Sequence, residues 1–526
     1  MSVTRRDVII GTLTGIVSIP FANLLMGAEG EKREFDYIIA GAGPAGSVLA
    51  ARLAAALPDA SILLMEAGGR VAKTEEDVWD PRRLVLVPSH PELEWGYQSV
   101  PQKELNGRVL NLLRGRGLGG CSLHNGMVYV RGGATGFDRW AEEGCTGWDY
   151  SSLLPHFQDI EATLNLTHAG SDPLMDDLIT ACAERNLPLV DDYNDQTNPL
   201  GISPFWFTIH KNRRVTAYSG FVEDRHLPNL SVMTGTLVQG LEMAGPKVTA
   251  LHYSTGQGTS SISAAREVIL ACGAIGSPQI LMLSGIGPSA HLHETGIRAK
   301  IDLPGVGANL QDDVLLPTVF LSKRPLPPQP YGLMSHVIFG DPEQRPDEET
   351  RLQTFLAPGN MIGSRLPPEL QNSWSLYPCL LLPESRGTVR LQSPDPARHP
   401  LIDPAFFSAA SDRQRSIAAL GLMREIGGSS ALDSWRLTEA APGPDVRSDA
   451  EILEYLRGSA DTCYHYAGTC KMGIDTMAVV DPQLRVYGTD NLRVVDASII
   501  PRTVSGNTAA ATMMIAHRAA GMIRAG

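Results

Sequence analysis

The stretch FDYIIAGAGPAG, residues 35–46, decides the fold, because an apolar run passes directly into a turn with three spaced glycines. The apolar run predicts a buried strand, and residues 47–57 predict the helix that follows the turn. In such a unit Gly41 permits the tight turn, Gly43 lets the backbone approach a pyrophosphate, and Gly46 lets the helix pack on the strand. We therefore predict a dinucleotide-binding turn.

A carboxylate stands where this motif requires one. Residues 61–65 predict a second strand, and Glu66 follows it, twenty residues after Gly46. At that place a carboxylate can accept hydrogen bonds from ribose hydroxyls. The order of strand, glycine turn, helix and strand predicts the opening of a parallel sheet with a right-handed crossover. The spacing alone leaves FAD and NAD both open.

Two later passages repeat the pattern of a strand followed by a helix. Residues 267–271 predict a strand that leads into a helix at 279–283, and residues 492–496 predict a strand that leads into a helix at 508–523. If all these strands share one sheet, the cofactor domain is discontinuous. We expect a cofactor domain made of 34–150, 231–319 and 461–526, and a substrate-binding domain made of 151–230 and 320–460.

Composition narrows the class of protein. A chain of 526 residues is too long for one hydrophobic core. Its 43% hydrophobic and 19% charged residues are typical of a globular protein. A net charge of -13 with dispersed basic residues argues against nucleic acid as a partner. The seven cysteines are widely spaced, without a Cys-x-x-Cys pair, so we predict no structural zinc or other metal site. A single disulfide between Cys463 and Cys470 stays open.

The first residues resemble a targeting segment. The sequence TRRDVII at 4–10, with a mildly apolar run after it, is typical of a twin-arginine export signal. We therefore expect a signal segment over 1–33 and a periplasmic or extracellular protein, with a signal anchor or a buried helix as the alternative. No other stretch reaches the roughly 20 apolar residues of a membrane span, so we expect no further integral membrane domain.

Three blocks resemble a known family. They read RGRGLGGCSLHN at 114–125 followed by YVRG at 129–132, GAIGSP at 273–278 with SGIGP at 284–288, and LPGVGANLQD at 303–312. Together they resemble the signatures of the glucose-methanol-choline (GMC) oxidoreductase family. The resemblance implies FAD rather than a nicotinamide. It also implies an α/β fold: a Rossmann-like FAD-binding domain with a parallel sheet, and a second α+β substrate domain built on a mostly antiparallel sheet.

The loop at 114–125 carries most of the expected flavin contacts. Its glycines let the backbone lie against a flat ring, and Asn125 can hydrogen-bond the isoalloxazine edge. The loop is similar to that of the choline-oxidising branch of the family, which implies a covalent 8α-histidyl bond from His124 to FAD. A histidine hydrogen-bonded beside the flavin is the alternative. The predicted cofactor-binding residues are Gly41, Gly43, Gly46, Glu66, Gly119, Gly120, Ser122, His124, Asn125, Gly126, Asp496, Ala497, Asn507 and Thr508.

The C-terminal blocks carry the expected catalytic residues. DTCYHYAGTCKMG at 461–473 and SGNT at 505–508 are similar to the family's last conserved stretches, which implies His465 and Asn507 as a catalytic pair at flavin N5. Alcohol oxidation needs a base at the hydroxyl and a hydride acceptor at the carbon. Imidazole suits the base, and a carboxamide can donate to the developing alkoxide. Asp313 departs from the family, because many relatives have histidine there, and its role stays open.

We therefore predict FAD-dependent oxidation of a small-molecule alcohol by hydride transfer to flavin N5, with His465 as the base. Oxygen, a quinone or a cytochrome is the expected electron acceptor. The alternatives are hydroxynitrile lyase or photodecarboxylase chemistry on the same scaffold, or a flavin-binding protein without enzymatic activity. The presence of both His465 and Asn507 favours alcohol oxidation. Cys379 is expected in the core of the second domain.

Overall fold

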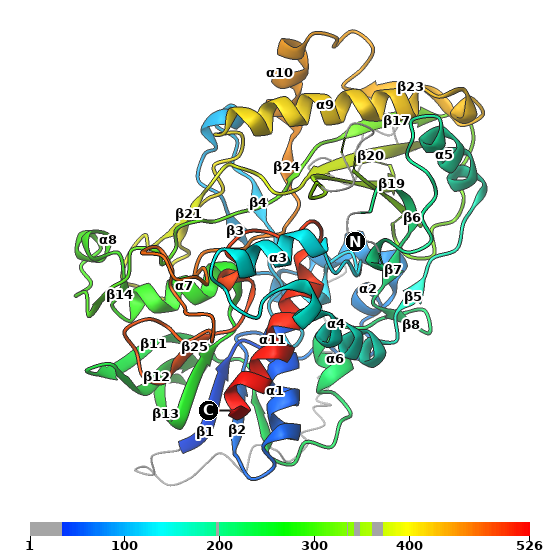
Figure 1. Ribbon diagram of the computed structural model, residues 1–526. Coiled ribbons are helices and arrows are strands. Elements are labelled where there is room, and N and C mark those ends of the chain that lie inside the picture. Colours follow the sequence, from blue (N-terminus) through cyan, green and yellow to red (C-terminus); the bar gives the residue numbers. More distant parts are fainter. Residues whose placement is uncertain are drawn as a thin grey trace, which may run out of the picture.

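Two sheets organise the chain, one in the lower part of Figure 1 and one in the upper part. The computed structural model describes residues 34–195, 199–333, 335–340, 344, 348–359 and 372–525. The expected signal segment, 1–33, lies outside the described residues. Within the described part of the chain, no helix combines the length and the apolar character that a membrane span requires.

The first sheet contains the predicted dinucleotide-binding strands. Its order is β10-β2-β1-β13-β12-β11, with β25 also paired to β13. Pairing is parallel from β10 to β13 and between β13 and β25, so the carboxyl ends of β1, β2, β13 and β25 share one edge. The bounds are β1 (Glu34–Ala40), β2 (Ile62–Met65), β10 (Leu230–Met233), β11 (Leu237–Ala244), β12 (Lys247–Thr255), β13 (Gly258–Leu270) and β25 (Leu492–Val494).

The two ends of the described chain meet on this sheet. Helix α1 (Pro44–Ala56) packs along α11 (Thr508–Ala525), and Figure 1 shows them side by side. Gly46 makes the start of α1 possible, because a Cβ there would lie 1.8 Å from the carbonyl oxygen of Gly41. Helix α11 also packs on α4 (Tyr150–Leu164). This packing places the residues just before α11 beside the glycine turn.

Helix α7 differs from the prediction, because it spans Gly273–Leu283 and so begins six residues earlier than expected. Pro278 lies inside it and has no N–H group to donate to the carbonyl of Ala274. The hydroxyl of Thr469 donates to that carbonyl at 2.6 Å. A partner distant in sequence therefore satisfies the group that the proline leaves free, and the helix starts at the glycine turn.

The second sheet is antiparallel and has the order β23-β17-β20-β19-β18-β6, extended by the short strands β16 and β24. Helix α9 (Ala410–Gly427) packs on β17 and β20, where Phe320 stacks on Trp374 with ring centroids 4.5 Å apart. The bounds are β6 (Gly201–Pro204), β16 (Val314–Leu315), β17 (Thr318–Ser322), β18 (His336–Phe339), β19 (Leu352–Pro358), β20 (Ser373–Leu380), β23 (Arg436–Ala441) and β24 (Asp461–Thr462).

Shorter elements connect the two sheets. The remaining helices are α2 (Glu76–Trp79), α3 (Ala134–Glu142), α5 (Pro173–Ala183), α6 (Ala217–Phe221), α8 (Ser289–Glu294) and α10 (Asp449–Ser459). The remaining strands form two-stranded pairs: β3 (Tyr97–Gln98) with β4 (Asn111–Leu112), β5 (Thr167–His168) with β7 (Trp206–Phe207), β8 (Ile209–His210) with β9 (Arg213–Arg214), β14 (Ile286–Gly287) with β15 (Ile301–Asp302), and β21 (Thr388–Arg390) with β22 (Leu401–Asp403).

The α/β fold with one largely parallel and one antiparallel sheet is confirmed. The division into domains stays a prediction. Two of its bounds fall inside strands, β10 and β17, and helices α4 and α6 from the expected second domain pack on α11 and α1. Such contacts arise because helices from different stretches of sequence cover the same face of the first sheet.

Candidate active site

One cavity of about 540 Å³ is lined by residues of both sheets and their loops. Most of the predicted site residues line it, although they come from four distant stretches of sequence. These residues are Gly41, Gly43, Glu66, Gly120, His124, Asn125, Gly126, His465, Asp496, Ala497, Asn507 and Thr508. The structure thus brings the predicted cofactor residues and the predicted catalytic pair to one place.

Three predicted cofactor residues do not line this cavity and instead support the residues that do. Gly46 lies beneath the turn at Gly41. The backbone N–H of Gly119 donates to the carbonyl of Ala42 at 2.8 Å. The hydroxyl of Ser122 accepts from the backbone N–H of Ala217 at 3.0 Å. A family motif marks positions that belong to the site. It does not distinguish a residue that lines the cavity from one that supports the lining.

Two glycine loops meet backbone to backbone at the cavity. A Cβ on Gly120 would lie 2.6 Å from the Cα of Gly43, and one on Gly41 would lie 2.5 Å from the carbonyl oxygen of Ala271. By contrast, a Cβ on Gly43 would meet no described atom closer than 3.9 Å, and it would project beside the N-terminus of α1. Free backbone N–H groups at a helix N-terminus attract an anion. These observations fit a cofactor with a pyrophosphate.

Glu66 does more than the sequence predicts. Its buried carboxylate accepts backbone N–H groups from Ala42 at 2.9 Å, Gly68 at 2.9 Å and Gly117 at 3.1 Å. Burial raises the pKa of this carboxyl group, and the three hydrogen bonds oppose that rise. A carboxylate offers about four acceptor sites, so Glu66 ties the glycine turn to the glycine loop and keeps capacity for a ribose hydroxyl.

Asp312 holds the loop that carries His465. The backbone N–H of His465 donates to a carboxylate oxygen of Asp312 at 2.8 Å, and the hydroxyl of Thr462 donates to the other oxygen. Tyr464 adopts a left-handed backbone conformation with φ 63°, which costs energy for a residue with a side chain. The buried Asp312 therefore fixes a strained turn and aims the imidazole at the cavity.

The side chain of His465 is hydrogen-bonded at both nitrogens. Nδ1 lies 2.9 Å from Oδ2 of Asp313, and Nε2 lies 2.9 Å from Nδ2 of Asn507. Gln353 Nε2 in turn donates to Oδ1 of Asn507 at 3.1 Å. With the Asn507 amide in this orientation, Nδ1 carries a proton and the lone pair of Nε2 accepts a hydrogen bond from Asn507.

Asp313 and Gln353 are the residues that the sequence did not place in the site. Both are buried, and together they fix the orientation of the predicted pair. The one available signal for Asp313 was its departure from the family pattern, since an acid replaces a histidine there. Gln353 lies on β19 in the second sheet, and no motif marks it.

The surroundings of His124 keep its imidazole neutral. Burial, reinforced by the positive charges of Arg114 and Arg214, lowers the pKa of His124 to about 3, so the imidazole is neutral at ordinary pH. Its Nε2 is buried without a hydrogen-bond partner among the described residues, and Oε2 of Glu94 lies 3.6 Å away. His124 thus lines the cavity with a neutral ring whose Nε2 is unpaired among the described residues.

The surroundings of Gly43 and Gly46 predict that one substitution affects cofactor binding and the other affects stability. Gly43→Ala adds a methyl group that the protein itself can accommodate, so the melting temperature of the apoprotein should stay near that of wild type while the FAD affinity falls at least about tenfold, because the methyl group meets the cofactor. Gly46→Ala should instead lower the melting temperature. Thermal unfolding of the apoproteins and the flavin-to-protein ratio after purification measure both effects. A Gly43→Ala protein with a full complement of flavin would contradict the placement.

Comparison with known proteins identifies the family. Family models described as GMC oxidoreductase match residues 35–315 and 383–516. The chain is 36% identical to an oxygen-dependent choline dehydrogenase from Pseudomonas aeruginosa (strain UCBPP-PA14), over 94% of this chain and 95% of that protein.

Solved structures extend the comparison to the fold. A pyridoxine 4-oxidase from Mesorbium loti superimposes with a TM-score of 0.85 at 33% identity, over 93% of this chain and 98% of that one. Formate oxidase from Aspergillus oryzae RIB40, at 24% identity and a TM-score of 0.86 over 94% and 98% of the two chains, shares the fold. The chain therefore belongs to the GMC oxidoreductase family, and it is an FAD-dependent oxidoreductase that acts on CH–OH groups.

Proposed function

We propose that His465 is the base and Asn507 the hydrogen-bond donor for oxidation of a small alcohol in the cavity. The carrying observation is the arrangement around the imidazole, in which Asp313 holds Nδ1 and Asn507 holds Nε2 of a ring that lines the cavity. Gly43, Glu66 and the loop through Gly120 would hold FAD beside it. When bound, FAD supplies the acceptor for the hydride that leaves the alcohol carbon.

The described residues account for the movement of the proton. A substrate hydroxyl takes the place of the Asn507 amide at Nε2 of His465 and gives its proton to that nitrogen, and the resulting imidazolium keeps its Nδ1–H bond to the carboxylate of Asp313. The amide nitrogen of Asn507 has two N–H groups, so the one not directed at Nε2 can donate to the developing alkoxide. Asp313 therefore acts as a positioning residue that also balances the new charge.

The surroundings favour the protonated imidazole. Burial alone lowers the pKa of His465, but the negative charge of Cys463 and the hydrogen bond to Asp313 outweigh it, so the pKa lies above its ordinary value. Since only the neutral imidazole can take the hydroxyl proton, activity should rise with pH as His465 loses its proton. Removing a negative charge beside the ring should lower the pKa of His465 and so move this rise to lower pH.

The wall opposite the cofactor loops points to an uncharged aromatic alcohol. The second sheet and its loops contribute apolar and aromatic side chains, namely Leu315, Leu333, Phe355, Ala357 and Tyr377. Among the described residues that line the cavity, the carboxylates are Glu66 and Asp496, which both follow strands of the first sheet. A cationic substrate would find no carboxylate at the second sheet. The 33% identity to pyridoxine 4-oxidase, which is named for an aromatic alcohol, supports the same class.

His124 is our candidate for a covalent bond to FAD. Its neutral imidazole and its place in the cavity wall, with Nε2 unpaired among the described residues, support this role. Denaturing the holoenzyme with acid separates the two alternatives. A covalent bond leaves the flavin fluorescence with the precipitated polypeptide, and His124→Ala releases it, whereas flavin in the wild-type supernatant would refute the bond.

Export and the electron acceptor are proposed from the sequence. The twin-arginine pattern at residues 4–10 supports export of the folded protein to the periplasm, where a membrane quinone is a closer acceptor than a cytoplasmic carrier. Cell fractionation tests the export, because replacing Arg5 and Arg6 with lysine should retain the protein in the cytoplasm. Turnover that is faster with oxygen than with a quinone dye would overturn the proposed acceptor in favour of an oxidase.

The role of Asp313 predicts a change in the pH profile. Asp313→Asn should lower kcat at least about tenfold, because the ring loses the anion that fixes its tautomer. It should also shift the rise of kcat/KM to lower pH, since the imidazolium loses a stabilising charge. The control is Asp172→Asn, which keeps a helix cap on α5 far from the cavity. An unchanged pH profile in Asp313→Asn would leave Asp313 a purely structural residue.

The substrate proposal is tested by anaerobic reduction of the bound flavin. We expect bleaching by benzylic or pyridinyl primary alcohols with a kcat/KM at least about tenfold above that for choline, because no carboxylate on the wall from the second sheet would pair with a buried cation. His465→Ala should slow the same reduction by about 10²–10⁴-fold while the flavin stays bound. Choline as the best substrate would refute the aromatic class, and rapid reduction in His465→Ala would refute the base.

A further inference from the structure

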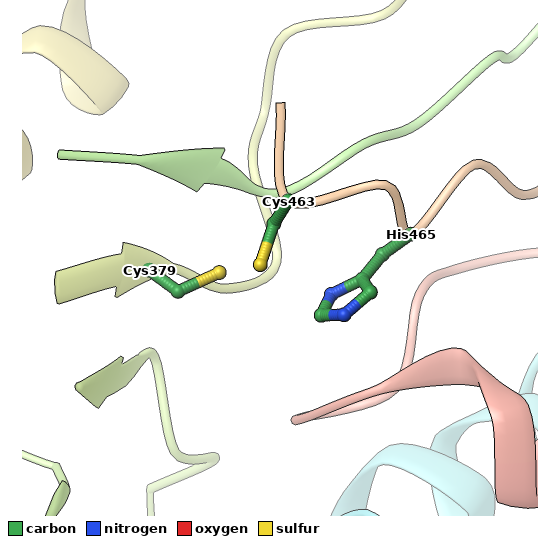
Figure 2. Close-up of side chains that lie close together, drawn as sticks. All are labelled: Cys379, Cys463 and His465. Carbon is green, nitrogen blue, oxygen red and sulfur yellow. The ribbon is translucent and has the colours of Figure 1, made fainter. Parts of the chain in front are cut away.

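A second group of side chains gathers behind His465. Cys379 near the end of β20, Cys463 directly after β24, and His465 each offer one ligand atom, and these atoms lie within 4.8 Å of one another. Figure 2 shows the sulfur atoms of Cys379 and Cys463 directed toward each other, with the imidazole of His465 on the other side of the Cys463 sulfur. All three residues are buried, and both thiols are free. In sequence Cys379 and Cys463 are too far apart for any ligand motif.

The spacing of the three atoms suits a tetrahedral cation. Bonds of about 2.3 Å to sulfur and 2.0 Å to nitrogen place such ligands roughly 3.5–3.8 Å apart, so small side-chain rotations complete the set. Asn507 already occupies Nε2 of His465, which leaves Nδ1 for a cation. Asp313 lies on that edge of the ring, and a cation at Nδ1 would free its Oδ2, which now meets that nitrogen at 2.9 Å. A carboxylate oxygen is therefore available as a fourth ligand.

The surroundings favour a cation that binds two thiolates. Leu381 and Leu382 enclose the sulfur atoms, with Leu315 and Phe355 packed against them. Two thiolates cancel the charge of one divalent cation, and the Asp313 carboxylate as fourth ligand leaves one net negative charge, which an apolar enclosure tolerates better than unpaired thiolates. Thiolate and imidazole ligands favour zinc over magnesium or calcium. Because Cys463 and His465 line the cavity, the cation can enter from the substrate side.

We propose that Cys379, Cys463 and His465 form an inhibitory zinc site. The inhibition rests on the proposed role of His465 as the base. A cation bound at Nδ1 displaces the hydrogen bond to Asp313 and leaves the remaining ring proton on Nε2. An Nε2 that already carries a proton cannot accept one from the substrate hydroxyl. Zinc therefore removes the base without displacing the cofactor.

The experiment counts zinc on the holoenzyme, prepared without an affinity tag and kept reduced with a phosphine. Glu75, Asp77 and His90 form another group that could hold a cation, so all proteins carry His90→Ala. Equilibrium dialysis with elemental analysis should find one zinc per chain at this site. Cys379→Ala and Cys463→Ala should each weaken zinc affinity at least about tenfold, by loss of a ligand.

The matched control is Cys182→Ala, a buried free cysteine on α5 outside the cluster, which should bind zinc like the parent. Zinc binding that is absent, or equal in Cys379→Ala and the parent, would overturn the site. In the same samples zinc should slow flavin reduction by alcohol in the parent while magnesium does not. Zinc bound at the cluster without this effect would overturn the inhibition. The count needs no turnover, so it stands even where the alcohol proposal fails.

Discussion

The hydrogen bonds that hold His465 between Asp313 and Asn507 are the constraint on which the rest of the structure depends. A buried polar side chain is costly unless each of its groups is paired, and His465 is only 6% exposed. Asp313 lies directly before β16, and Asn507 lies directly before α11. Gln353 on β19 holds Asn507 in place. Both sheets and the packing of α11 on α1 must form before this set exists, so the site reports the completed fold.

Two consecutive acids divide the work at this site. Asp312 holds the backbone of His465 and the turn at Tyr464, whereas Asp313 holds the imidazole. Burial raises the pKa of both acids, and the hydrogen bonds that they accept oppose the rise. The same anionic surroundings that stabilise an imidazolium also attract a cation. Cys379 and Cys463 lie beside the ring, and they connect the proposed catalytic base to the proposed zinc site.

The local parts of the molecule could be predicted, and the parts made by distant contacts could not. The apolar strand before Gly41 and the spaced glycines encode the β1, α1, β2 unit within about 30 residues, and the family motifs brought His465, Asn507 and His124 to one cavity. The start of α7 was missed because Thr469, 195 residues away, supplies the bond that Pro278 removes. Cys463 faces Cys379 rather than Cys470, because β20 and β24 flank β16 in the second sheet. Such pairings depend on sheet register, which the sequence does not display.

The most direct test of this account is the tautomer of His465 in the holoenzyme, measured by nitrogen-15 NMR on histidine-labelled protein and assigned by the loss of its signals in His465→Ala. At a pH of maximal turnover we expect a neutral ring with the proton on Nδ1 and an unprotonated Nε2, as the hydrogen bonds to Asp313 and Asn507 require. A neutral ring with its proton on Nε2 would contradict the account, because that nitrogen could not accept the hydroxyl proton of an alcohol.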